Sequence, residues 1–102
     1  MENSSKKTRL NRIGIRRLYL AIEKHVKSVL DSFVFEKVDS KTLVKLHKEI
    51  EWQLDVWKMQ GAFKDYDVSM GYRKQSLSVS VVIYSHPPME DFSLTCTIYP
   101  HE

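Results

Sequence analysis

Cysteine and glycine are scarce in this chain, and long apolar runs are missing. Among its 102 residues are one cysteine, Cys96, and three glycines. A single cysteine cannot form an internal disulfide or build a cysteine metal site, and three scattered glycines exclude a glycine-rich phosphate loop. No apolar run approaches the roughly 20 residues that cross a bilayer, and residues 1–10 lack the apolar core of a secretory signal. We therefore expect no membrane span, no secretory signal and a reducing compartment, most simply a cytoplasm.

The sequence also lacks any group of residues with the spacing of a catalytic or metal site. Its four histidines (His25, His47, His86 and His101) are scattered, and none has a second histidine three or four residues away. Cys96 lies on the apolar side of an alternating segment, which favours a buried structural thiol over a nucleophile. We therefore expect a protein that is not an enzyme and that holds no cofactor or metal ion.

The residues that are present are typical of one small globular domain. Hydrophobic residues make up 42% and charged residues 28% of the sequence, and eleven aromatic side chains supply enough bulk for one modest core. The first residues are polar and charged. We expect a flexible basic tail over residues 1–9 and a single domain over residues 10–102.

Positive charge is concentrated near the N-terminus. Residues 6–17 contain six basic residues and no acid, whereas the rest of the chain has ten basic and thirteen acidic residues. Such a cluster suits a solvated helix face, contact with nucleic-acid phosphates, or contact with an acidic protein surface. Single-strand binders need several aromatic platforms, and only Tyr19 lies nearby, which favours the acidic protein surface. The residues expected to make this contact are Arg9, Arg12, Arg16 and Arg17.

Two segments have the apolar spacing of amphipathic helices. The first is expected to begin near residue 10, with Asn11 as its N-cap, and to end at the β-rich run 33–35. The second is expected to begin at Asp39 or Ser40, either of which can cap it, and to end at Gly61.

Each helix has one apolar stripe, and each stripe needs something to cover it. Trp52 lies off the stripe of the second helix, so we expect it to cover a flank or to face a partner. The side chains predicted to form the core are Leu18, Ile22, Leu46, Leu54, Trp57, Val79, Val81 and Leu94.

The C-terminal 40 residues change to the two-residue period of strands. Apolar residues alternate with hydroxyl-bearing residues over residues 76–84 and 92–99, and a proline-containing turn joins the two segments. Residues 63–70 are a weaker candidate strand. We therefore expect an α+β fold, in which two helices pack on one face of a small, mainly antiparallel sheet in the order α-α-β-β-β.

A sheet of three strands has two free edges, which a neighbouring chain can extend. The segments 76–84 and 91–99 carry few residues that block such pairing. We therefore predict that strands from neighbouring subunits extend this sheet, with residues 1–9 as one short donor. The partner-binding residues expected on the two strands are Ser76, Ser78, Ser80, Thr95 and Thr97.

Several short matches, in the same order, resemble the C-terminal domain of contractile phage tail sheath proteins. The run N-R-I-G-I-R-R-L at residues 11–18 resembles the start of a helix in that family, and an I-E pair follows at 22–23. The later matches are V-F-E at 34–36, G-A at 61–62 after a long helix, and a strand, a proline-containing turn and a strand at 81–95. Together the matches cover about residues 10–99.

The resemblance implies a structural component of a contractile phage tail or a related injection machine. In that family this domain lies nearest the inner tube, and extended arms of neighbouring subunits add strands to its sheet. The implied partners are other sheath or tail subunits and an acidic tail-tube surface, without a membrane. The implied location is the virion, after assembly in the host cytoplasm.

The chain departs from the family in length. Only about nine residues precede the match, and the sequence ends soon after the last strand. A minimal sheath, a specialised subunit at a sheath end and a gene fragment all fit this departure. A small nucleic-acid-binding module that uses the same arginines is the alternative function.

Overall fold

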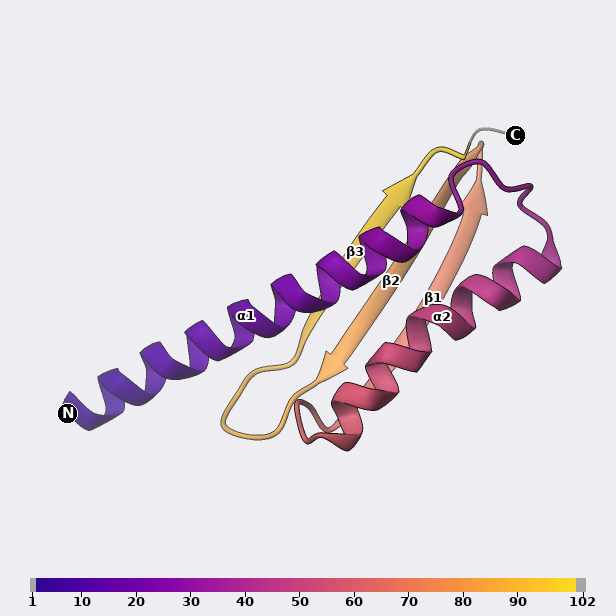
Figure 1. Ribbon diagram of the computed structural model, residues 1–102. Helices are drawn as coiled ribbons and strands as arrows, with labels where there is room; N and C mark the ends of the chain where they lie inside the picture. The colour runs from indigo at the N-terminus through magenta and orange to yellow at the C-terminus, as the bar shows by residue number, and fades with distance from the viewer. Residues whose placement is uncertain (1, 101–102) are drawn as a thin grey trace.

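The computed structural model describes the backbone of residues 2–100 and the side chains of residues 14–100. It confirms the α+β fold in the order α-α-β-β-β (Figure 1). The elements are α1 (Glu2–Ser32), α2 (Ser40–Met59), β1 (Asp65–Arg73), β2 (Ser76–Tyr84) and β3 (Phe92–Ile98). None of the helices described is long and apolar enough to cross a membrane.

The first helix is longer than the sequence pattern predicts. α1 begins at Glu2, so Asn11 lies inside the helix and is not its N-cap. Residues 2–9, expected as part of a tail, continue the same helix, because they contain no proline or glycine to interrupt it. As a result, the N-terminal part of α1 projects past the end of the sheet (Figure 1).

Both ends of α2 are capped as predicted. Asp39 is the N-cap, and its Oδ1 accepts a hydrogen bond of 2.8 Å from the Thr42 backbone N–H. At the other end Gly61 has a φ of 85°, which a residue with a side chain rarely adopts. The N–H groups of Gly61 and Ala62 donate back to the carbonyls of Lys58 and Trp57, both at 3.0 Å, and satisfy the last turn.

The sheet is an antiparallel meander in the order β1-β2-β3. A two-residue turn joins β1 to β2, and both of its residues, Lys74 and Gln75, have positive φ values of 51° and 68°. These angles match the twist of a tight hairpin. The turn lacks the glycine or asparagine that usually marks such a hairpin, so the sequence carried little signal for it.

Both helices cover the same face of the sheet, where the core lies (Figure 1). Six of the eight predicted core residues are buried, and the other two, Leu18 and Trp57, are partly buried and pack against the core. The side chains with no exposed surface are Ile22, Val26, Leu30, Leu46, Ile50, Leu54, Val79, Val81 and Ile83.

Truncation of Leu54 tests the burial of α2. Leu54 has no exposed surface, so Leu54→Ala leaves a cavity between α2 and the sheet. We expect the free energy of unfolding to fall by about 2–5 kcal/mol in denaturant titrations. Val44→Ala on the same helix is the control, since Val44 is 54% exposed and its truncation should change stability by less than about 0.5 kcal/mol. Equal losses in the two variants would contradict this placement of the helix.

Candidate functional site

The central strand of the sheet is β2, which corrects one prediction. β2 pairs with β1 on one side and with β3 on the other. The backbone groups of Ser76, Ser78 and Ser80 therefore lie inside the sheet, and the expectation that this strand offers a free edge is wrong. The Ser76 hydroxyl also stays within the hairpin, where it donates to the Arg73 carbonyl at 2.8 Å.

The free edge on the α1 side of the sheet belongs to β3. Arg73 and Ser76 flank a two-residue turn and so form a hydrogen-bonded pair, and such pairs recur at every second residue. The even-numbered residues of β2 therefore bond to β1 and the odd-numbered residues to β3. The odd-numbered residues of β2 lie opposite the even-numbered residues of β3, so the even-numbered residues of β3 are the ones that bond to β2. The backbone groups that point away from the sheet are those of Ser93, Thr95 and Thr97.

The two edges of the sheet differ in how well they are guarded. β1 carries the charged residues Asp65 and Asp67 at one end and Arg73 at the other, and charged side chains discourage pairing with a further strand. β3 has the sequence F-S-L-T-C-T-I, without a charge or a proline. The unguarded edge is therefore that of β3.

Hydroxyl groups pair across β2 and β3 on the face turned away from the helices. Ser78 Oγ lies 2.9 Å from Thr97 Oγ1, and Ser80 Oγ lies 3.0 Å from Thr95 Oγ1. Cross-strand pairs of this kind stabilise the register of a sheet. These four predicted residues thus hold β3 against β2, while the backbone of Thr95 and Thr97 remains open at the edge.

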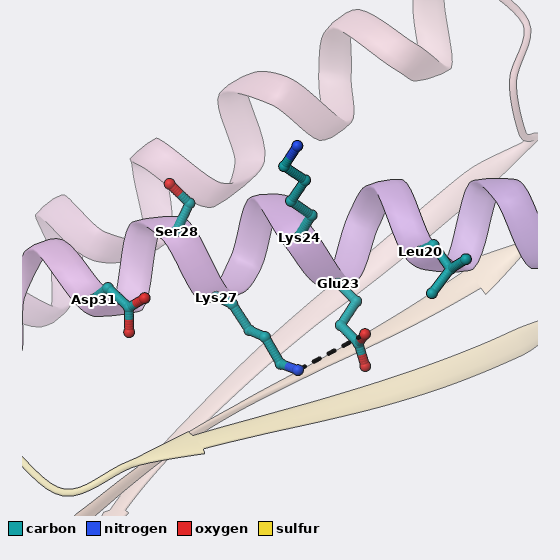
Figure 2. Close-up of a pocket in the computed structure, with 6 residues that line it drawn as sticks. All are labelled: Leu20, Glu23, Lys24, Lys27, Ser28 and Asp31. Carbon is teal, nitrogen blue, oxygen red and sulfur yellow. Dashed lines mark ion pairs between the residues drawn. The ribbon is translucent and has the colours of Figure 1, made fainter.

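Next to this edge, α1 carries a shallow hollow of about 560 Å³ on its exposed side (Figure 2). α1 runs along β3, and the rings of Tyr19 and Phe92 lie 5.9 Å apart between centroids. Lys27 Nζ and Glu23 Oε1 are 3.7 Å apart. The hollow is lined by Leu20, Glu23, Lys24, Lys27, Ser28 and Asp31. We call the open backbone of β3, together with Leu20, Glu23 and Lys27, the β3-edge site.

Cys96 is buried under this part of α1. Burial raises the pKa of its thiol, the positive charge of Lys27 lowers it, and Glu23 raises it. The net pKa lies above the ordinary value of a thiol, so Cys96 is poorly reactive. Lys27 and Glu23 therefore belong to the part of α1 that lies near β3 (Figure 2).

The described structure places two of the four predicted arginines. Arg16 and Arg17 are both exposed on α1, whereas the side chains of Arg9 and Arg12 lie outside the described residues. Successive residues are about 100° apart around a helix. Arg16 therefore shares the side of α1 that carries Glu23 and Lys27, and Arg17 points elsewhere.

Two of the histidines have structural partners. His25 Nε2 lies 3.3 Å from the Ile50 carbonyl and links the two helices, and His47 Nδ1 lies 2.6 Å from Glu51 Oε1. Within the part of the chain that the structure describes, no group of three or more His, Cys, Asp or Glu side chains is arranged to hold a metal ion.

No family model, no curated protein and no solved structure matches this chain. The candidate site therefore rests on the geometry of the chain itself. Of the residues at the β3-edge site, the sequence pattern indicates Thr95 and Thr97 but not Ser93, Leu20, Glu23 or Lys27. The helical period identifies the residues of α1 that face the core, but it does not say which strand the exposed side of α1 accompanies.

The reactivity of Cys96 tests the charge environment of the β3-edge site. Lys27→Met removes the positive charge that lowers the thiol pKa, so the thiolate fraction falls and alkylation at neutral pH should slow. Glu23→Gln should have the opposite effect. The measurement is the rate of iodoacetamide labelling, which mass spectrometry follows. The parent protein and the two variants are compared under conditions in which all three are equally stable. Identical rates in all three proteins would mean that labelling requires β3 to open, and would contradict the electrostatic effect.

Proposed function

We propose that the protein is a structural component of a contractile phage tail or a related injection machine. It acts as a small sheath-like subunit that packs around the tail tube or at a sheath end, assembles in the host cytoplasm and resides in the virion. The proposal is supported by the resemblance of residues 10–99 to the C-terminal domain of sheath proteins.

The observation that carries the proposal is the unguarded edge of β3. Ser93, Thr95 and Thr97 direct N–H and C=O groups away from the sheet, and unpaired backbone groups favour the addition of a further strand. A sheet of only three strands is also a marginal structure, which a fourth strand would stabilise. An extended segment from a neighbouring subunit would pair with these backbone groups and would also stabilise the sheet.

The surroundings of the edge define the strand that it would accept. Side chains of an added strand alternate between the two faces of the sheet. On the helix face they would meet Leu20, which is 48% exposed, and the Glu23–Lys27 pair. On the open face they would extend the rows of hydroxyl groups that end at Thr95 and Thr97. The expected donor therefore alternates apolar or amphipathic residues with small polar ones.

The exposed arginines of α1 give the subunit a second contact, with an acidic surface such as that of a tail tube. Arg16 lies on the side of the β3-edge site, and Arg17 lies about a quarter-turn away. Exposed ion pairs contribute only about 0.2–1 kcal/mol each, so this contact is cumulative and salt-sensitive.

Thr95→Pro tests strand addition at β3. The proline removes an N–H group that points away from the sheet, so β3 keeps its hydrogen bonds to β2 while its free edge is blocked. We expect a folded protein that no longer assembles at low salt, as measured by sedimentation. In the parent protein, hydrogen exchange should show the amides of Ser93, Thr95 and Thr97 protected in the assembly and labile in the monomer.

Two matched variants serve as controls for Thr95→Pro. Thr95→Val keeps the N–H group and the preference for a strand, and it should assemble normally. Met70→Pro removes an outward N–H group from the edge of β1 and should also leave assembly intact. Loss of assembly in Met70→Pro alone would assign strand addition to β1 and overturn the β3-edge site.

Charge reversal tests the arginine contact. Arg16→Glu/Arg17→Glu should weaken assembly at low salt and leave the thermal unfolding midpoint nearly unchanged, because both side chains are exposed. The comparison is made with and without added nucleic acid. Assembly that occurs only with nucleic acid, and that the reversal abolishes, would favour the nucleic-acid-binding function instead.

A further inference from the structure

α2 carries a second apolar surface on the side turned away from the sheet. Val44, Trp52 and Met59 are 54%, 66% and 87% exposed. At about 100° per residue, the three side chains lie within an arc of about 80° around the helix. This arc is opposite the buried side chains of the same helix, and its apolar side chains remain exposed.

Three charged residues, Lys41, Lys48 and Asp55, lie in the same arc. Lys48 and Asp55 are both exposed and alternate with the apolar residues along the helix. Lys48 has no ion-pair partner among the described residues. Asp55 Oδ1 accepts a hydrogen bond of 2.6 Å from the Tyr66 hydroxyl, which fixes the carboxylate at the surface. We call Val44, Lys48, Trp52, Asp55 and Met59 the α2 stripe.

The α2 stripe is complementary to the same stripe on a second copy of α2 that runs in the opposite direction. Consider a second α2 that lies antiparallel to the first, with the midpoint of the helix contact between residues 51 and 52. Val44 is then opposite Met59 of the second copy. The same midpoint places Lys48 opposite Asp55 and brings the two Trp52 side chains together. Apolar residues thus meet apolar residues, and Lys48 meets Asp55, whereas Lys41 falls opposite residue 62, beyond the end of α2.

We propose that the α2 stripe is a docking surface for a second copy of this chain, whose α2 packs antiparallel across a two-fold axis near Trp52. A two-fold interface uses the same patch on both subunits and therefore requires the self-complementarity that the stripe has. Tryptophan is the side chain most often central to the binding energy of an interface, and here it lies at the axis. The spacings of eight and seven residues keep the three apolar side chains on one side of the helix.

The size of the surface sets the strength of this contact. One helix against another buries less area than the roughly 1,200 Å² of a stable interface, so the dimer is weak and reversible. The charges contribute orientation more than affinity, because a parallel arrangement would place Lys48 against Lys48 and Asp55 against Asp55. The proposal does not depend on strand addition at β3, which involves another side of the molecule.

Cysteine cross-linking tests the antiparallel register. Chains that carry Val44→Cys are mixed with chains that carry Met59→Cys under mild oxidation, with Trp52 retained and the native Cys96 buried. We expect disulfide-linked dimers in the mixture and few in either variant alone, because residues 44 of the two copies lie about 20 Å apart in this register. Efficient cross-linking of Val44→Cys to itself would indicate parallel helices, and a mixture that yields no dimer would also overturn the proposal.

Charge swapping tests the predicted pairs in solution. Lys48→Glu places two acids opposite each other twice per dimer, and we expect the dissociation constant from sedimentation equilibrium to rise by about tenfold. Lys48→Glu/Asp55→Lys should restore dimerisation, because the pairs are then reversed in sign. Lys24→Glu, the same change on α1, is the control and should have no effect. Failure of the double variant to recover, at unchanged stability, would overturn the register.

Trp52→Ala measures the apolar part of the contact. We expect the dissociation constant to rise by more than about tenfold, while the unfolding midpoint stays within about 2 °C of the parent because Trp52 is largely exposed. A parent protein that remains monomeric up to millimolar concentration would overturn the proposal, whatever other partner the stripe binds.

Discussion

The burial of β2 under both helices is the constraint on which the rest of the structure depends. Its four inward side chains (Leu77, Val79, Val81 and Ile83) are at most 1% exposed, and they are in the middle of the apolar layer between the sheet and the helices. Two helices suffice to cover one face of three strands but not both faces. The second face must therefore be polar, and it carries serine and threonine hydroxyls that satisfy one another between β2 and β3.

The same constraint explains why the edges of the sheet differ. α1 lies along β3 and α2 along β1, and each helix leaves the backbone edge beside it open (Figure 1). Charged residues guard β1, whereas β3 lies under α1, where its inward residues Leu94 and Cys96 are buried and Phe92 and Ile98 are partly buried. An edge strand that is free of charge and packed against a helix is a suitable template for a further strand.

The sequence predicts those features that depend on local patterns. The period of the apolar residues identifies both helices, and Asp39 and Gly61 fix the ends of α2, because caps act through hydrogen bonds within a few residues. The alternation of residues 76–84 identifies a strand but not its neighbours, since a central strand and an edge strand of a one-sided sheet have the same period. The pattern therefore predicts an edge position for Ser76, Ser78 and Ser80. In the structure β1, whose own pattern is weaker, pairs with their strand. The start of α1 was also missed, because residues 2–9 have no apolar stripe and their helix depends on propensity alone.

Two of the proposed contact surfaces, the β3-edge site and the α2 stripe, lie at opposite margins of the sheet, and this arrangement decides whether they can act together. α1 accompanies β3 at one margin of the sheet, and α2 accompanies β1 at the other margin (Figure 1). Pairing of two α2 helices would therefore leave both β3 edges at the outer ends of the dimer, free to accept strands. Arg16 and Arg17 lie on α1, away from the axis of such a dimer. Two copies would then present two strand-accepting edges and two basic helices at once, so that weak contacts at each surface add up in a multivalent assembly.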